Sequence, residues 1–93
     1  MLFKRKQELE CPAIAKSPGA VEVLRVWAVP GAPQQFSLRP TWKDPAAWGL
    51  MLADLAHHAA KAYAAEGWSE AEVFERIIAG LKAEIESPTD SPS

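Results

Sequence analysis

Three polar residues near the middle of the chain have the types and the spacing to do chemistry: Asp54, His57 and His58. Asp54 and His58 stand one helical turn apart, a spacing that lets two side chains reach a common metal ion. They supply two ligands, whereas structural zinc takes four, and the zinc-protease pattern of two histidines around a glutamate is absent from the sequence. We therefore predict no metal and no cofactor, and we interpret the three residues as an exposed polar cluster on a helix.

Ser37 and Cys11 are the side chains that could act as a nucleophile together with a histidine. No Gly-x-Ser-x-Gly turn surrounds Ser37, and the five glycines stand apart instead of forming a phosphate-binding loop. We expect a non-enzymatic interaction or regulatory protein. The alternative is a small metal- or ligand-binding protein, or an enzyme, that uses the polar cluster.

Aromatic and basic residues are interleaved between residues 25 and 43, beside the start of a predicted helix. The chain has four tryptophans in 93 residues, and Trp and Arg are the residues most often dominant at protein interfaces. The alternative is that these aromatic side chains fill a small core. The predicted partner-binding residues are Arg25, Trp27, Arg39, Trp42 and Lys43.

The length and the charge of the chain limit the classes of protein to which it can belong. Ninety-three residues allow one domain, and no apolar run approaches the roughly 18 residues that would span a membrane. The net charge is −2, with eight basic and five acidic residues in 1–61 but two basic and seven acidic in 62–93. Because no stripe of Lys and Arg is concentrated on one element, we do not expect a nucleic-acid binder. A single cysteine permits no internal disulfide, so we expect a cytoplasmic protein.

The elements that must position these residues are two helices and a hairpin. Asp44-Pro45 is a helix start, and nine of the twenty residues in 46–65 are alanine. We predict that this helix ends at Gly67 and that a second helix opens with a Ser69–Glu72 capping box. The predicted polar side of the first helix carries Asp54, His57 and Lys61, and its predicted apolar stripe runs through Trp48, Met51, Leu52, Leu55, Ala59, Ala62 and Tyr63.

Before the helices, residues 20–29 and 34–38 read as two strands joined by a Pro-Gly turn. The predicted fold is therefore α+β, an antiparallel β-hairpin followed by two antiparallel amphipathic helices. Both faces of the first strand carry apolar residues, so we expect the helices to cover one face and a second copy to cover the other, the face of Val23 and Trp27. Such a homodimer could extend the sheet edge to edge or pair the hairpins face to face. The alternative is that the N-terminal arm lies across that face.

We predict a flexible arm at 1–19, a single domain at 20–86 and a disordered tail at 87–93. The arm begins with the basic cluster Lys4, Arg5 and Lys6. Pro12, Pro18 and Gly19 interrupt it. The tail is rich in Ser and Pro, a composition that does not support a packed core.

The motifs E-V-L-R-V-W, P-G-x-P-Q-Q, D-P-x-x-W-G and H-A-A-K-A-Y occur in order along the chain. In these motifs, over residues 20–85, the sequence resembles a family of small bacterial proteins described as a domain of unknown function. The resemblance implies a shared fold and a bacterial setting, and it carries over no functional residue.

A shorter segment, residues 35–40, is similar to the Q-Y-S-L-W-P segment of the MbtH-like helper proteins of peptide synthetases. Arg39 stands where that family has a tryptophan. This similarity implies an alternative in which a larger protein is the partner.

Overall fold

The computed structural model of this chain describes residues 8–88. The chain divides into two compact units, Met1–Lys43 and Asp44–Ser93, which we call the hairpin unit and the helical unit. The basic cluster at 4–6 and most of the predicted tail at 87–93 lie outside the described residues. The single domain predicted over 20–86 stays a prediction.

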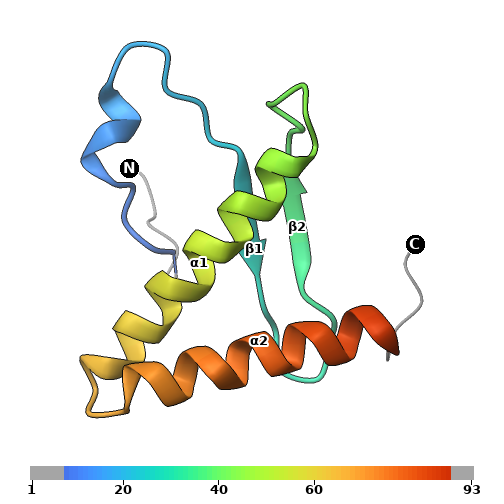
Figure 1. The fold of residues 1–93 in the computed structure, drawn as a ribbon. Helices are drawn as coiled ribbons and strands as arrows, with labels where there is room; N and C mark the ends of the chain where they lie inside the picture. The colour runs from blue at the N-terminus through green and yellow to red at the C-terminus, as the bar shows by residue number, and fades with distance from the viewer. Residues whose placement is uncertain (1–7, 89–93) are drawn as a thin grey trace. The chain divides into compact units, whose positions relative to one another are not determined.

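The hairpin unit contains a short 3-10 helix, η1 (Ala13–Lys16), and two antiparallel strands, β1 (Leu24–Trp27) and β2 (Gln35–Leu38). The two strands lie side by side in Figure 1. β1 is shorter than the strand predicted over 20–29. One further hydrogen bond, from the Arg39 N–H to the Val23 carbonyl at 3.1 Å, continues the ladder beyond it.

A type II turn begins the loop between the strands. The Ala32 N–H donates to the Val29 carbonyl at 3.1 Å, and Gly31 has a φ of +80°. Pro30 has the fixed φ that the first central position requires, and glycine tolerates the positive φ of the second. The Pro-Gly pair therefore forms the turn that the sequence predicts.

The register of the strands gives the hairpin two different faces. Leu24 lies opposite Leu38 and Val26 lies opposite Phe36, so one face is wholly apolar. On the other face Arg25 lies opposite Ser37, and Trp27 opposite Gln35. Arg25 of β1 together with Ser37 and Gln35 of β2 makes this face partly polar.

The first helix of the helical unit, α1 (Ala46–Ala64), begins where the sequence predicts. The Asp44 carboxylate accepts a hydrogen bond from the Ala46 N–H at 2.9 Å. Pro45, directly before the helix, has a φ of −57° and a ψ of −20°, which are already helical values.

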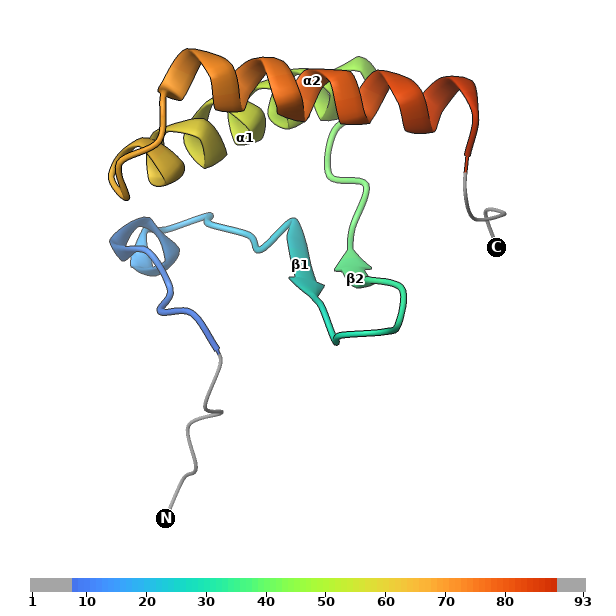
Figure 2. The same ribbon diagram turned by 90° about the horizontal axis from the view of Figure 1, so that it is seen from below.

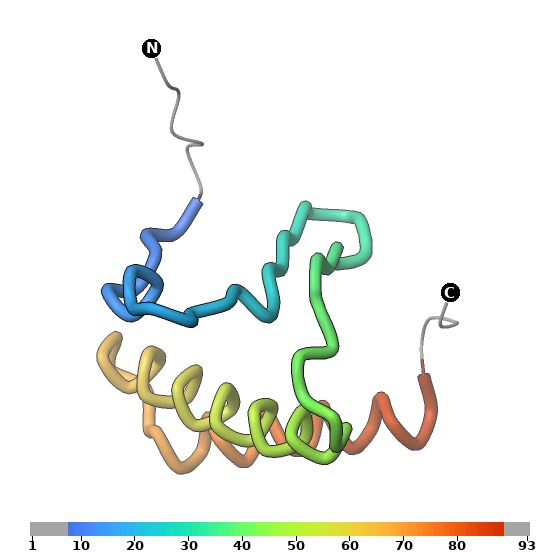
Figure 3. The backbone as a smooth tube through the Cα atoms, turned by 90° about the horizontal axis from the view of Figure 1, so that it is seen from above, coloured from blue at the N-terminus to red at the C-terminus, as the bar shows by residue number. Residues whose placement is uncertain are grey.

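The turn after α1 is a Schellman motif. Gly67 has a φ of +99°, and its N–H donates to the Ala64 carbonyl at 3.0 Å. The Trp68 N–H donates to the Tyr63 carbonyl at 3.2 Å. The Cα trace reverses tightly at this point (Figure 3). The predicted stop at Gly67 is confirmed in its backbone conformation.

The second helix, α2 (Glu70–Glu86), starts at a side-chain cap. The Ser69 Oγ accepts from the Glu72 N–H at 3.3 Å, which is the serine half of the predicted capping box. Glu70 and Glu72 lie in the first turn, where the helix dipole favours negative charge.

The two helices contact each other (Figures 1 and 2). They pack through a face of α1 that differs from the predicted apolar stripe. The buried residues are Ala56 and Ala60 on α1 and Val73 on α2. Beside them Lys61 pairs with Glu70 at 3.3 Å, so part of the side predicted to face solvent meets α2 instead. The cause is physical: alanine lets two backbones approach closely, and periodicity does not decide which of two adjacent apolar faces is used.

The connector between β2 and α1 contains a strained residue. Thr41 has a φ of +65°, and the Trp42 N–H donates to the Pro40 carbonyl at 2.7 Å, which closes a three-residue γ-turn. This turn type is rare, and a positive φ is unfavourable for a β-branched residue. The Thr41 hydroxyl donates to the Arg39 carbonyl at 2.9 Å and so fixes the turn from the side chain.

Candidate functional site

Large apolar side chains remain exposed on both units. On the hairpin, Val26 is 46% exposed, Phe36 62% and Leu38 58%, whereas Leu24 is half-buried. On α1, Leu52 and Leu55 of the predicted apolar stripe are each about half exposed. Exposed apolar surface of this extent is typical of protein-interaction sites.

Arg25, one of the predicted partner-binding residues, is the centre of a charge network. Its guanidinium donates to Glu22 at 3.0 Å and to Glu8, from the N-terminal segment, at 3.3 Å. The hydrogen bonds to Glu22, together with the negative charges of both carboxylates, raise the pKa of Arg25 above its ordinary value. The guanidinium is therefore charged at all physiological pH values, and its fork is engaged within the chain.

Residues 8–12 line a cavity of about 360 Å³ together with β1, and Arg25 and Trp27 are in its wall. Leu24 and Val26 of the apolar face line the same cavity, so the N-terminal segment reaches β1 without being assigned to one face of it. The alternative in which the arm lies across the face of Val23 and Trp27 stays a prediction.

The other predicted partner-binding residues, Arg39, Trp42 and Lys43, follow β2 along the connector. Trp42 is 41% exposed, and both basic residues are exposed. All three lie within five residues of each other and beside the strained Thr41. The structure thus separates the predicted set into Arg25 and Trp27, which line the cavity with residues 8–12, and Arg39, Trp42 and Lys43, which follow β2 along the connector.

The polar cluster on α1 has one unexpected contact. The ring of His57 stacks on Phe74 of α2, with ring centroids 4.3 Å apart and planes 10° from parallel. His57 therefore takes part in the helix–helix contact, although the sequence places it on the solvent side. Over residues 8–88, no group of three or more His, Cys, Asp or Glu side chains is arranged to hold a metal ion.

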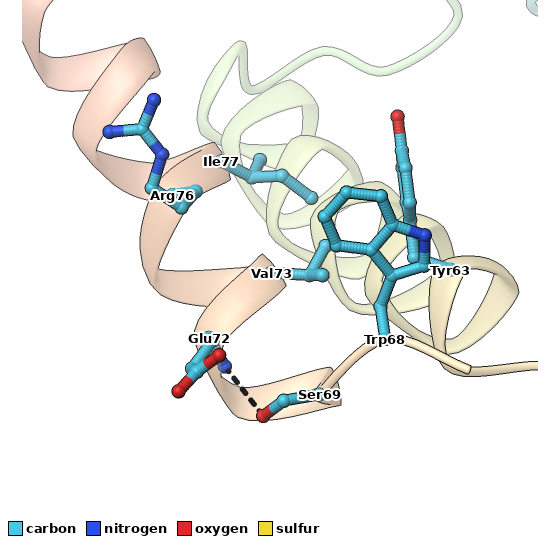
Figure 4. Close-up of a pocket in the computed structure, with 7 residues that line it drawn as sticks. All are labelled: Tyr63, Trp68, Ser69, Glu72, Val73, Arg76 and Ile77. Carbon is cyan, nitrogen blue, oxygen red and sulfur yellow. Dashed lines mark hydrogen bonds between the residues drawn. The ribbon is translucent and has the colours of Figure 1, made fainter. Parts of the chain in front are cut away.

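A shallow notch of about 400 Å³ lies beside the turn that joins the helices (Figure 4). Its apolar wall consists of Tyr63, Trp68, Val73 and Ile77, and the two aromatic rings meet edge to face with centroids 5.6 Å apart. In Figure 4 the charged ends of Glu72 and Arg76 point away from the indole. The notch can therefore accept an apolar side chain but presents no converging polar groups.

Trp68 is the aromatic residue that the sequence reasoning did not single out, and it is 60% exposed. The sequence does contain a signal for the position of Trp68. In a Schellman motif the residue after the glycine commonly contacts the residue four positions before the glycine, and these are Trp68 and Tyr63 here.

Among the described residues, no helix is both long and apolar enough to cross a membrane. Two comparisons with known proteins bear on the chain, and a search of curated proteins finds no match to it.

The chain is similar in sequence and in fold to a solved structure from the photosynthetic bacterium Rhodopseudomonas palustrus CGA009. That protein is provisionally named a pyruvate dehydrogenase. The two sequences are 35% identical, and the similarity covers 99% of this chain and 95% of the other, with a TM-score of 0.74.

A family model described as a domain of unknown function, DUF5076, matches residues 8–89. This match covers nearly the whole chain and agrees with the resemblance found in the sequence motifs. The chain belongs to the DUF5076 family.

Proposed function

We propose that this protein is a non-enzymatic interaction or regulatory module that acts as a homodimer. The observation that carries the proposal is the contrast between buried and exposed apolar side chains over residues 8–88. The buried ones are two alanines and one valine, whereas fifteen large hydrophobic side chains are exposed.

The free energy gained by burying exposed apolar side chains supports association with a second copy. Fully burying a Leu or Phe side chain contributes about 1.5–3 kcal/mol, so each exposed one leaves that stabilisation unused. Small domains bury a smaller share of their surface on folding than large ones do, so cover supplied by a partner adds relatively more to their stability. A second copy is present wherever the first is, so it is the simplest partner that can supply the missing cover.

The exposed segment of Arg39, Trp42 and Lys43 supports a second contact, with a larger protein. Both cations are exposed, and Trp42 offers an aromatic surface beside them. Because Arg25 is already paired with two carboxylates, this segment is the better candidate for the predicted partner-binding surface.

An enzyme is the second candidate, because the similar protein of R. palustrus is named for pyruvate dehydrogenase activity. In this chain the reactive residues would be those of the Asp54, His57 and His58 cluster. The geometry supports this candidate less, since the His57 ring is stacked on Phe74. Consumption of pyruvate by the purified protein, lost in a His58→Ala variant, would favour the enzyme.

The experiment that tests the homodimer is the solution mass by light scattering over a wide range of concentrations. We expect a mass near twice that of the 10.1 kDa chain, falling toward the monomer only on dilution. A mass of one chain at every concentration would overturn the homodimer.

A further inference from the structure

Residues 39–43, which we call the connector loop, have a backbone that is fixed by hydrogen bonds within the hairpin unit. The Arg39 N–H donates to the Val23 carbonyl at 3.1 Å, which ties the start of the loop to the residue before β1. The Arg39 carbonyl accepts from the Thr41 hydroxyl at 2.9 Å, and the γ-turn centred on Thr41 closes at 2.7 Å. The bonds that shape the loop therefore lie in one unit.

The backbone strain in the connector loop is concentrated at Thr41. Its φ of +65° is unfavourable for a β-branched residue. Strained conformations persist where the surrounding structure fixes them, and they cluster at binding and catalytic sites. A backbone that is held in one shape before binding loses little conformational entropy when a partner binds. The strain therefore favours a preshaped contact surface over a passive link.

The connector loop is locally cationic. Arg39 and Lys43 are exposed, and no carboxylate among the described residues forms an ion pair with either of them. The sequence has no acidic residue between Glu22 and Asp44, and the Asp44 carboxylate accepts from the first N–H of α1. The two cations are therefore available to carboxylates from outside the chain.

We infer that the connector loop binds a short acidic segment of a partner protein. Arg39 and Lys43 pair with its carboxylates, and an apolar side chain of the segment lies on the indole of Trp42, which is 41% exposed. The guanidinium fork of arginine matches a carboxylate with two hydrogen bonds. This inference rests on the proposed contact with a larger protein and adds the chemistry of the partner.

A short acidic peptide fits the connector loop better than a nucleic acid does. Nucleic-acid binding requires many cations along one surface, because each one neutralises a phosphate. The loop has two exposed cations, and the chain as a whole has a net charge of −2, which repels a long polyanion. Two cations are enough to pair with neighbouring carboxylates of one peptide.

The test is a nuclear magnetic resonance titration of the isotopically labelled full chain at low salt. The probe is a synthetic peptide in which glutamates flank a central leucine. We expect chemical-shift changes in the backbone amides of the connector loop and in the indole N–H of Trp42. The matched control is the same peptide with glutamine in place of every glutamate, and we expect it not to change these resonances.

A pair of variants assigns the charges. Arg39→Gln combined with Lys43→Gln should raise the dissociation constant of the glutamate peptide about tenfold, because two exposed ion pairs are lost. Lys16→Gln combined with Lys82→Gln removes the same charge from exposed positions outside the loop and should change it little. Unchanged resonances of the other residues show that each variant is folded. Equal affinities of the two double variants would overturn the inference.

Thr41→Gly tests whether the loop is preshaped. Glycine tolerates the positive φ but leaves the loop free to take other conformations, and the bond from the Thr41 hydroxyl is lost. The cations and the indole are unchanged, so we expect binding of the glutamate peptide to weaken about fivefold for a backbone reason alone. Unchanged binding would overturn the preshaped loop.

The remaining outcomes identify a different occupant. Equal binding of the glutamine peptide would assign the loop to apolar contact, and larger changes of the same resonances with single-stranded DNA would assign it to nucleic acid. A lower light-scattering mass of the Arg39→Gln, Lys43→Gln variant without peptide would assign it to a second copy. Each of these results overturns the acidic partner. The homodimer is tested separately, by the mass of the wild-type protein, and can stand when the acidic partner fails.

Discussion

In the helical unit, residues from both helices enclose Ala56, Ala60 and Val73, and a stacked ring pair and an ion pair flank them. In the hairpin unit no described residue is buried, and the Arg25–Glu8 ion pair joins two residues 17 positions apart in the sequence. Both units have regular hydrogen-bonded backbones. They differ in whether side chains from the same unit cover the apolar surface.

This difference indicates which unit the proposed partner would stabilise more. A two-stranded hairpin on its own is marginally stable in water, whereas two helices can share a contact along their length. We expect the helical unit to stay folded without a partner. The hairpin unit, in contrast, should need cover over its apolar surface to be stable. Variants in each unit test this expectation.

The largest effect is expected at Ala60, which is 1% exposed at the helix–helix contact. Ala60→Leu adds three carbons where the two backbones are close, so the helices must separate. We expect the free energy of unfolding of the helical unit to fall by about 1–3 kcal/mol, measured by urea unfolding followed by circular dichroism. Ala79→Leu, on the exposed side of α2, is the control. Equal stabilities of the two variants would contradict an alanine-lined contact.

Gly67 gives the next largest effect, because its φ of +99° is unfavourable for any residue with a Cβ. Gly67→Ala is expected to destabilise the turn between the helices by about 1–2 kcal/mol. Gly80 lies inside α2, where an added Cβ would meet nothing within 4 Å. Gly80→Ala should therefore stabilise the protein by about 0.5–1 kcal/mol. Thermal unfolding measures both, and shifts of the same sign would contradict the assigned turn.

A smaller loss of stability is expected from variants of the neighbouring histidines, His57 and His58. His57→Ala removes the stack on Phe74 and should cost about 0.5–1.5 kcal/mol of helical-unit stability. His58→Ala, one residue away and exposed, should cost less. His57→Phe should keep most of the stability. If His57→Ala is neutral while zinc binding is lost, the polar cluster has the ligand role instead.

The smallest effect is expected in the hairpin unit, at Arg25. Arg25→Gln removes the ion pairs with Glu8 and Glu22, which are partly exposed and screened by salt. We expect little change in unfolding but faster proteolysis within residues 8–12, which contact β1 through Glu8. Unchanged proteolysis would mean that Arg25 does not hold that segment.

The helix boundaries could be predicted from the sequence because they depend on local chemistry. Asp44 and Ser69 accept hydrogen bonds from nearby backbone N–H groups, and Gly67 takes a conformation that few other residues tolerate. The Pro-Gly turn of the hairpin was predicted on the same basis. Each of these signals lies within four residues of the structure that it specifies.

The contacts between elements could not be predicted in the same way. α1 has an alanine face and a leucine-containing stripe side by side, and only the position of α2 shows which one is buried. The stack of His57 on Phe74 joins residues 17 positions apart, and no periodicity encodes it. The contact of Glu8 with Arg25 likewise depends on where the N-terminal segment runs.

The small size of the enclosed residues has a thermal consequence. The heat-capacity increase on unfolding scales with the apolar surface that unfolding exposes, about 12–15 cal/mol/K per residue in ordinary domains. A chain that encloses Ala56, Ala60 and Val73 exposes little additional apolar surface when it unfolds alone. If the proposed homodimer forms, dissociation would expose further apolar surface and add to the heat-capacity increase, and calorimetry at rising protein concentration should then show a rising unfolding temperature.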